Sequence, residues 1–155
     1  MNFKFERFSL EDEDQITDIL LRNIDYAGRI KNVKKMIEWN ILHQDDLYRK
    51  IVNDNNDIIG YIGYDDASLK ENTRKFATPN DLYLEIYLHP NYTNKGLGVE
   101  IFKRSLEYIP LNKSKIYAST YTSNLRAQRF LIKCGMKYIG IGVHRNTFIY
   151  EYKIR

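Results

Sequence analysis

The segment from 82 to 110 constrains the fold most strongly, because it joins a strand to a helix through a turn that contains Gly96 and Gly98. Residues alternate between apolar and other types from Leu82 to His89, as in a strand. A helical stripe then follows, made of Val99, Phe102, Leu106 and Ile109 and ended by Pro110. The glycines let a ligand approach the unpaired first amides of the helix. The turn therefore predicts an anion site suited to a phosphate-bearing cofactor.

Two common phosphate-binding motifs do not match this turn. A Rossmann fingerprint requires a third glycine at the position of Ile101, and a P-loop requires a Gly-Lys-Ser or Gly-Lys-Thr ending, which is absent. The sequence therefore favours a strand–turn–helix anion site outside these two nucleotide-binding classes.

The rest of the chain alternates between strand and helix patterns. We expect further strands at 3–8, 47–52, 58–64, 116–121, 138–143 and 147–154, with a hairpin turn at 53–57. Further helices are expected after Ser9, at 30–42 and from Ser123 or Asn124 to Cys134, with Gly135 as a left-handed C-cap. Their apolar faces are Ile16, Ile19, Leu20 and Ile24, then Ile30, Val33, Ile37 and Ile41, then Ala127, Phe130, Leu131 and Cys134. The polar stretch 65–80 has no periodicity, and we expect a long, mobile loop that borders the active site.

Composition indicates one domain over residues 1–155, since 43% hydrophobic content is enough for a core. The single cysteine, Cys134, excludes a disulfide framework, and the N-terminus has no apolar run like a signal peptide, so we expect a cytoplasmic protein. No apolar stretch is long enough to span a membrane. The net charge of +4 is spread along the chain and argues only weakly for nucleic acid as a partner.

No metal site is expected. The acidic run from Glu11 to Asp14 falls in the first turn of a predicted helix, where negative charge favours the helix dipole. The three histidines, His43, His89 and His144, are far apart in sequence, and no cysteine or carboxylate spacing completes a metal motif.

Two segments together resemble a known family, the GNAT superfamily of acetyl-CoA-dependent N-acetyltransferases. Residues 88–98 resemble its pyrophosphate-binding loop, and residues 124–136 resemble a later motif in which Asn begins a helix and Gly before a large apolar residue ends it. The resemblance implies an α+β fold of three layers, with a central mixed, mostly antiparallel sheet of six to seven strands flanked by about four helices. It also implies acetyl-CoA as cosubstrate.

The resemblance further implies site residues. Glu85 is the carboxylate on the polar face of its strand, where family members often place a general base, and the backbone amide of Leu88 would stabilise the oxyanion. Cofactor contacts would come from Tyr87, Leu88, Asn94, Lys95, Gly96, Leu97, Gly98, Val99 and Asn124. His89, at the end of the strand, is an alternative base to Glu85.

Two positions depart from the family pattern. Thr93 stands where Arg or Gln is usual, and Lys95 is the obvious substitute for that contact. Leu131 stands where many members carry a Tyr that protonates the leaving thiolate, so Cys134, Tyr121 or water would have to replace it.

The acceptor implied by the resemblance is a primary amine on a small molecule or peptide. Small amines, aminoglycoside-like antibiotics, amino acids and protein amino termini all stay open, and a homodimer is one option for assembly. We keep two alternative functions. A catalytically weak acetyl-CoA-binding or sensor module would retain the glycine turn without acid or base. A nucleic-acid-binding protein would need Lys103, Arg104, Lys113 and Lys115 on one basic face.

Overall fold

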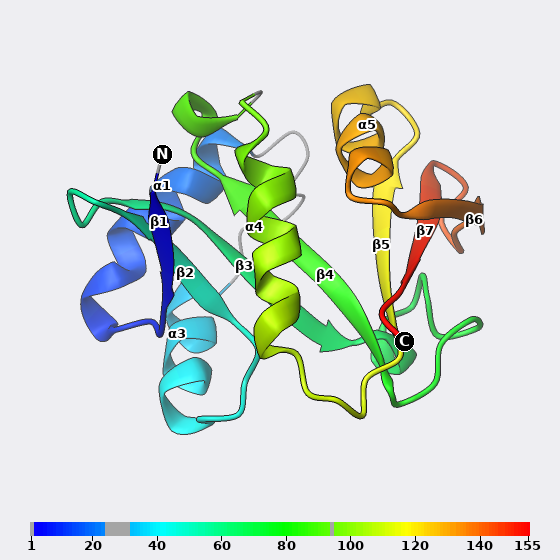
Figure 1. The fold of residues 1–155 in the computed structure, drawn as a ribbon, viewed down its shortest axis with the longest axis horizontal. Helices are drawn as coiled ribbons and strands as arrows, with labels where there is room; N and C mark the ends of the chain where they lie inside the picture. Colours follow the sequence, from blue (N-terminus) through cyan, green and yellow to red (C-terminus); the bar gives the residue numbers. More distant parts are fainter. Residues whose placement is uncertain (1, 24–31, 94) are drawn as a thin grey trace. The chain divides into compact units, whose positions relative to one another are not determined.

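The computed structural model describes residues 2–23, 32–93 and 95–155. Its seven strands form one sheet in the order β1-β2-β3-β4-β5-β7-β6 (Figure 1). The strands are β1 (Phe3–Glu6), β2 (Arg49–Asn53), β3 (Ile58–Asp66), β4 (Asp81–Leu88), β5 (Lys115–Tyr121), β6 (Lys137–Ile141) and β7 (Thr147–Lys153). The α-helices within the described ranges are α1 (Glu13–Arg22), α3 (Val33–Leu42), α4 (Leu97–Ser105) and α5 (Leu125–Lys133).

The sheet is mixed and mostly antiparallel, which confirms the expected fold class. β1 pairs with β2, β2 with β3, β5 with β7 and β6 with β7, all antiparallel. β4 and β5 are parallel. The hairpin predicted at 53–57 is confirmed, because the Asn53 side-chain oxygen accepts hydrogen bonds from the backbone N–H groups of Asn55 and Asp57 and closes the turn.

The chain divides into two compact units. The first comprises Met1–Gly63 and Ile86–Lys95, and the second comprises Tyr64–Glu85 and Gly96–Arg155. In the first unit, α1 and α3 contact each other, and their buried faces form a core with Phe8, Tyr48 and Tyr61. The predicted face residues Ile16, Ile19, Leu20, Val33 and Ile37 are buried, whereas Ile24 and Ile30 lie outside the described residues. Ile41 is exposed, so that part of the predicted face is wrong.

The acidic run at 11–14 has a structural role at Asp12. This carboxylate is buried, accepts a hydrogen bond from the Ser9 backbone N–H at 2.7 Å, and forms an ion pair with the Lys50 ammonium at 2.8 Å. It thereby caps the first helical turn and neutralises a partly buried lysine. Within residues 2–23, 32–93 and 95–155, no three His, Cys, Asp or Glu side chains are grouped so as to hold a metal ion.

In the second unit, β7 lies between β5 and β6, and α5 packs beside β5 (Figure 1). The stretch 65–80 was expected to be a mobile loop, but it is built around buried side chains. Ala67 and Thr73 are fully buried, and the Thr73 hydroxyl donates to the Ala67 carbonyl at 2.7 Å. Asp66 caps the short 3₁₀ helix Ala67–Leu69 by accepting from the Ser68 N–H at 2.9 Å. The sequence pattern did not reveal this packing, because polar residues without periodicity can still pack when their own backbone satisfies them. The mobility of the stretch stays a prediction.

Helix α4 differs from its expected register. It begins at Leu97, and its buried residues are Leu97, Ile101, Phe102 and Ser105, while Val99 and Leu106 are only half-buried. The predicted stripe left out the buried apolar residues Leu97 and Ile101. It also left out Ser105, whose hydroxyl is buried through hydrogen bonds to the Phe102 carbonyl and the Tyr64 hydroxyl, both at 2.6 Å. Helix α5 follows its prediction at both ends: the Asn124 side chain accepts from the Ala127 N–H at 3.0 Å, and Gly135 has φ of +94°.

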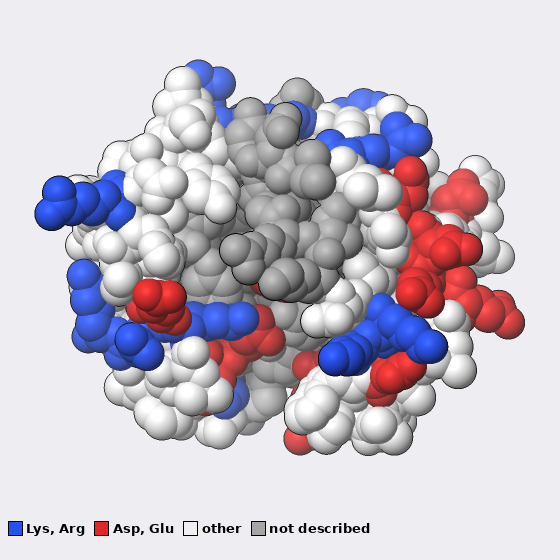
Figure 2. All heavy atoms as spheres, turned by 180° about the vertical axis from the view of Figure 1, so that it is seen from behind, with Lys and Arg blue, Asp and Glu red and all other residues white. Residues whose placement is uncertain are grey.

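Charged side chains on the face drawn in Figure 2 are interspersed: among the described residues, Lys and Arg are scattered between acidic and uncharged groups. Lys115, one of the four cations considered for nucleic acid, lies 3.7 Å from the Glu151 carboxylate. Across the described ranges, no helix combines the length and apolar character needed to cross a bilayer.

Candidate functional site

The glycine turn presents the N-terminus of α4. Gly96 is the N-cap, with φ of +74°, a left-handed conformation that glycine adopts without strain. The first backbone bond into the helix runs from the Glu100 N–H to the Gly96 carbonyl at 3.3 Å. The amides of Leu97, Gly98 and Val99 precede that bond, as the first amides of any helix do, and are available to an anion.

Space around Gly96 is open. A Cβ atom built there would meet no atom of the described residues within 4 Å. Lys95, the predicted substitute cation, is exposed, and Asn94 lies outside the described residues. The Thr93 hydroxyl donates to the Pro90 carbonyl at 2.8 Å, so it serves the turn that precedes the helix. The turn thus combines an open backbone with a helix N-terminus.

The strands β4 and β5 part near the predicted site. Their parallel register pairs Asp81, Leu82 and Tyr83 with Lys115, Ile116 and Tyr117 and ends there. Beyond that point β4 runs on to Leu88 and β5 to Tyr121. A ligand can bond to strand backbone at the point where the pairing of two parallel strands ends. Glu85 lies two residues beyond the end of this pairing.

The backbone of Leu88 faces the edge of β4 that is turned away from β3. Within the first unit, the His89 N–H donates to the Ile59 carbonyl of β3 at 2.8 Å, and the Tyr87 carbonyl lies against Gly60 of β3. In a strand, the backbone N–H and C=O of one residue lie on the same edge, and those of the next residue lie on the opposite edge. Since Tyr87 and His89 face β3, the backbone N–H and C=O of Leu88 lie on the edge away from β3. Its carbonyl accepts a hydrogen bond from the Asn23 side chain at 3.0 Å. The sequence gave no sign of this contact, since 65 positions separate the two residues.

Two predicted cofactor residues also serve the fold. The Tyr87 ring packs against the core of the first unit, with its centroid 5.4 Å from that of Tyr61. Asn124 is buried and caps α5. Their assignment to the cofactor stays a prediction.

A cluster of charged and aromatic side chains in the second unit is close enough to Glu85 for its charge to act on Lys70 and Tyr83. The Lys70 ammonium lies 3.1 Å from the Asp65 carboxylate and 5.7 Å from the centroid of the Tyr83 ring. The Tyr83 hydroxyl is hydrogen-bonded to Ser119 of β5. Asp65, Lys70 and Ser119 were missed in the sequence, because only the approach of β3 and the 67–80 segment to this part of β4 brings them together.

The electrostatics of this cluster favour positive charge on Lys70. Burial acts to lower the pKa of its ammonium, but the negative charges of Asp65 and Glu85 outweigh burial and raise the pKa above its usual value. Burial also raises the pKa of the Tyr83 phenol, which therefore stays protonated at neutral pH. Among the described residues, Glu85 is thus grouped with one further carboxylate, one ammonium and one neutral phenol.

One buried hydroxyl in this part of the second unit lacks a partner. Thr120 lies on β5 beyond the residues that pair with β4, and it is only 8% exposed. Among the described residues, none hydrogen-bonds to its Oγ1. A buried hydroxyl without a partner destabilises the protein by about 1–3 kcal/mol, so Thr120 is a candidate ligand contact.

Valine at position 120 should therefore make the unliganded protein more stable. We expect Thr120→Val to raise the melting temperature by about 2–4 °C, which corresponds to about 1 kcal/mol for a chain of this size. Thr147→Val is the matched control, because the equally buried Thr147 hydroxyl donates to the His144 carbonyl at 2.6 Å and its loss should lower the melting temperature. Thermal unfolding followed by circular dichroism measures both. A fall in both variants would contradict the assignment of Thr120.

The candidates for protonating a leaving thiolate differ in accessibility. Leu131 is 4% exposed and belongs to the buried face of α5. Cys134 is also buried, and burial raises the pKa of its thiol to about 12, which makes it a weak acid and supports a core role. Tyr121, at the end of β5, is 37% exposed. Of the two candidate acids, Cys134 and Tyr121, only Tyr121 has a side chain that solvent and a ligand can reach.

His89 is half-buried and has local partners. Its Nδ1 accepts a hydrogen bond from the Asn91 N–H at 3.2 Å, and its ring meets that of Tyr92 edge to face at 6.2 Å. Because Nδ1 is occupied by the hydrogen bond from the Asn91 N–H, only Nε2 of His89 is left for proton transfer.

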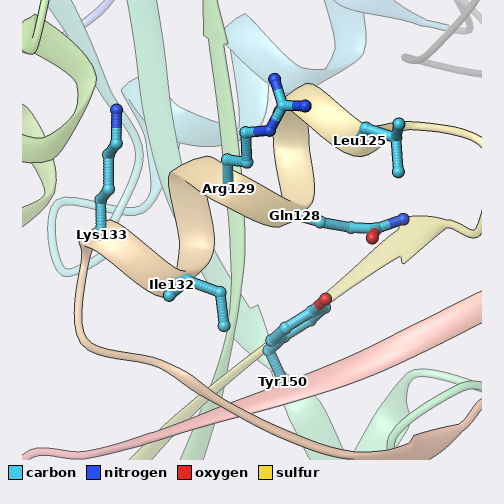
Figure 3. Close-up of a pocket in the computed structure, with 6 residues that line it drawn as sticks. All are labelled: Leu125, Gln128, Arg129, Ile132, Lys133 and Tyr150. Carbon is cyan, nitrogen blue, oxygen red and sulfur yellow. The ribbon is translucent and has the colours of Figure 1, made fainter.

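A surface hollow of about 440 Å³ lies between α5 and β7. Figure 3 shows Gln128 and Ile132 on the side of α5 toward Tyr150, whereas Arg129 and Lys133 point away from it. Leu125 completes the lining. The Gln128 amide donates to the carbonyls of Tyr121 and Thr122, at 3.2 and 3.0 Å, and so joins α5 to the end of β5. None of the predicted site residues lines this hollow.

Solved structures of acetyltransferases share this fold. The yncA protein of Salmonella typhimurium, solved with its cofactor acetyl-CoA, is 19% identical, with a TM-score of 0.73 over 100% of this chain and 95% of that one. Spermidine N-acetyltransferase of Vibrio cholerae, in complex with CoA and spermine, is 17% identical, with a TM-score of 0.71 over 97% and 95%. An aminoglycoside acetyltransferase in complex with coenzyme A is 17% identical, with a TM-score of 0.76 over 98% and 95%. No curated protein matches the chain in sequence.

The strand order, with β4 and β5 as a parallel pair and a glycine-capped helix after β4, defines the class of fold seen in these acetyltransferases. The family model described as an acetyltransferase (GNAT) domain matches residues 5–137. The chain belongs to this GNAT acetyltransferase family, which confirms the resemblance identified in the two sequence segments.

Proposed function

We propose that the protein is an N-acetyltransferase that moves an acetyl group from acetyl-CoA to a primary amine. The observation that carries this proposal is the early end of the β4–β5 pairing, in the same unit as the open N-terminus of α4. At the end of the pairing, strand backbone can bond the amide-bearing arm of the cosubstrate. At the N-terminus of α4, helix amides can bond its pyrophosphate. The two units would act as one domain, since the family match spans both.

The cosubstrate contacts we propose follow the glycine turn. The amides of Leu97, Gly98 and Val99, with the open backbone of Gly96, would hold the pyrophosphate, and Lys95 would add an exposed positive charge. Asn94 is retained in this set by its place in the motif. Tyr87, Asn124 and the Thr120 hydroxyl would contact the acyl-bearing arm.

The reaction requires a neutral amine. An alkylammonium with a pKa near 10.4 needs about 5 kcal/mol to lose its proton at pH 7, so a base lowers the barrier. We assign this role to Glu85, which takes the proton directly or through water as the nitrogen attacks the thioester carbonyl. The tetrahedral intermediate then expels the thiolate by cleavage of the C–S bond, and the amide product forms. The thiolate takes a proton from Tyr121 or water.

The Leu88 amide would stabilise the oxyanion of that intermediate. Its N–H shares an edge of β4 with the Leu88 carbonyl, and the Asn23 side chain bonds that carbonyl and the Ile19 carbonyl of α1, at 3.0 and 2.8 Å. Asn23 therefore ties the end of β4 to the end of α1 and fixes the direction of the Leu88 amide. It is a positioning residue in this proposal.

Loss of the Asn23 side chain should reduce turnover more than cosubstrate binding. We expect Asn23→Ala to lower kcat by about tenfold, because the Leu88 N–H would move away from the oxyanion. Loss of such a donor lowers the rate by about 100-fold or more in other enzymes, and a displaced donor should lose part of that effect. KM for acetyl-CoA should change less than threefold. Asn23→Asp keeps the size but cannot donate, so it should behave like Asn23→Ala, whereas Asn55→Ala in the β2–β3 turn serves as control. A wild-type kcat after normalisation to the folded fraction, measured by circular dichroism, would contradict this role.

The acceptor is an amine whose identity the family leaves open. Two of the structural neighbours are named for spermidine and aminoglycosides, both of which carry several amino groups. Release of free CoA thiol, followed across a panel of amines with a thiol reagent, tests the proposal. Turnover with any amine supports it. Tight acetyl-CoA binding without turnover of any amine would favour the alternative, a catalytically weak acetyl-CoA-binding module.

Cellular setting and assembly stay predictions. A cytoplasmic location would suit the single buried cysteine, which needs no oxidising compartment. A homodimer is the assembly to test by sedimentation.

A further inference from the structure

Thr120 lies on the face of the sheet that α4 and α5 cover in the second unit. In the antiparallel pairing of β5 with β7, Thr120 is directly opposite Phe148, so the two side chains share a face. By alternation along β7, Tyr150 and Tyr152 lie on that face too. Tyr150 lines the hollow between α5 and β7, and the Tyr152 ring meets the Phe102 ring of α4 edge to face at 5.3 Å. The Thr120 side chain therefore points into the layer of these two helices.

Glu85 belongs to the opposite face of the sheet. The Tyr83 hydroxyl is hydrogen-bonded to Ser119, and Glu85 shares the face of Tyr83 because side chains alternate along a strand. Tyr83 pairs with Tyr117 in the parallel register of β4 and β5. Two residues farther along each strand, Glu85 is level with Ser119, and Thr120 follows about 3.3 Å beyond. Glu85 and Thr120 thus lie at nearly the same height along two parting strands, on opposite faces.

These two faces suit the two sides of a thioester. The base that takes the proton of the amine is assigned to the face of Glu85, whereas the pyrophosphate of the cosubstrate is assigned to the N-terminus of α4, a helix on the face of Thr120. The sulfur joins the acyl group to the arm that leads to this pyrophosphate. A thioester between the parting strands would therefore turn its carbonyl carbon toward Glu85 and keep its sulfur on the side of Thr120.

The Thr120 hydroxyl is suited to such a contact. It belongs to a side chain that is 8% exposed, and among the described residues none hydrogen-bonds to its Oγ1. Leu131, on the buried face of α5, has no polar side-chain atom to contribute to the same layer. A hydroxyl that donates to an anion makes a hydrogen bond about twice as strong as one to a neutral acceptor. The Thr120 hydroxyl would thus bind the sulfur most strongly when the sulfur carries negative charge.

We propose that Thr120 donates a hydrogen bond to the sulfur of coenzyme A and stabilises the thiolate that forms when the C–S bond breaks. This inference rests on the proposed function and assigns a residue of the chain to the leaving group of the same reaction. The electron pair of the C–S bond stays on the sulfur, while the carbonyl carbon keeps its new bond to the amine nitrogen. Thr120 retains its own proton throughout, and the proton that the thiolate finally takes comes from Tyr121 or water.

The acidity of bound coenzyme A tests the proposal without an acceptor and without turnover. The ultraviolet absorbance of the thiolate would be followed from about pH 6 to 10 for protein saturated with coenzyme A, with the titration of the free protein subtracted. We expect the bound thiol to be about tenfold more acidic in the wild type than in Thr120→Val, because only the charged form gains the stronger hydrogen bond.

Two further variants separate the hydroxyl from the shape of the side chain. Thr120→Ser keeps the hydroxyl and should restore most of the acidity of the bound thiol. Thr147→Val removes an equally buried hydroxyl that donates to the His144 carbonyl at 2.6 Å, and it should leave that acidity at the wild-type value. Circular dichroism of each variant shows whether it is folded.

The outcomes separate this inference from the proposed function. Equal acidity of the bound thiol in the wild type and Thr120→Val would overturn the inference, even if amines are acetylated well. A loss of acidity that Thr120→Ser does not restore, or that Thr147→Val also shows, would overturn it too. If the acidity changes as expected but no amine releases CoA thiol from acetyl-CoA, the contact of Thr120 stands and the acetyltransferase proposal fails. If coenzyme A does not bind to the wild type, both fail.

Discussion

Replacing Glu85 by glutamine should lower kcat/KM for acetyl transfer at pH 7 by about 100- to 10,000-fold, the range that a positioned general base supplies. The substitution keeps the shape of the side chain and removes only its ability to take a proton. The remaining rate should then follow the neutral fraction of the amine and rise about tenfold for each pH unit toward the amine pKa near 10.4. Steady-state release of CoA between pH 6.5 and 10 measures both effects.

The control for this experiment is Glu107→Gln, at an exposed carboxylate of the second unit in the 3₁₀ helix Leu106–Tyr108. Its activity and pH profile should equal those of the wild type. Acetyl-CoA affinity should be unchanged in both variants, because Glu85 is assigned to the amine and not to the cosubstrate. A Glu85→Gln enzyme with wild-type activity at pH 7 would remove Glu85 from its role and leave His89 Nε2 as the base to test.

Alanine at Gly96 should weaken acetyl-CoA binding by about 10- to 100-fold. Gly96 has φ of +74°, and the space around its Cα is open in the described part of the chain. An added methyl group would therefore cost only the left-handed strain, about 1–2 kcal/mol, in the free protein. With acetyl-CoA bound, the same methyl group would lie where the pyrophosphate approaches the backbone. Titration calorimetry with acetyl-CoA gives the affinity, and chemical denaturation gives the loss of stability.

Gly135→Ala separates strain from ligand contact. Gly135 has φ of +94° at the end of α5, and a Cβ there would lie 3.5 Å from the Tyr152 ring, an ordinary contact distance. Both variants should lose similar unfolding free energy, but only Gly96→Ala should lose affinity. Similar losses of affinity in the two variants would show that the effect is conformational, and would argue against an anion site at the turn.

Local signals in the sequence predicted most of the secondary structure. The hairpin at 53–57 and the two ends of α5 were predicted correctly because Asn53, Asn124 and Gly135 act on backbone groups only a few residues away. The glycine turn was recognised for the same reason. Short-range hydrogen bonds and φ preferences are properties of a few consecutive residues, so a sequence displays them directly.

Two differences between the sequence-based prediction and the structure involve buried polar residues. The predicted α4 face left out Ser105, which is buried through a hydrogen bond to Tyr64, and the pattern of the segment 65–80 gave no sign that Thr73 is fully buried. In both cases the partner that makes burial favourable is either distant in sequence or a backbone group. Hydrophobic periodicity reports only the spacing of apolar residues, so it does not reveal these hydrogen-bond partners.

By itself, the sequence determined the family and predicted the place of the cosubstrate site, since two short motifs hold the glycine turn and the capped helix. Only the tertiary structure brought Asp65, Lys70 and Tyr83 together and joined Asn23 to the Leu88 carbonyl. Only the tertiary structure left the Thr120 hydroxyl without a partner among the described residues. The physical reason is one of range. A helix N-terminus is built by consecutive residues, whereas the cluster of Asp65, Lys70 and Tyr83 depends on groups that meet across strands and loops.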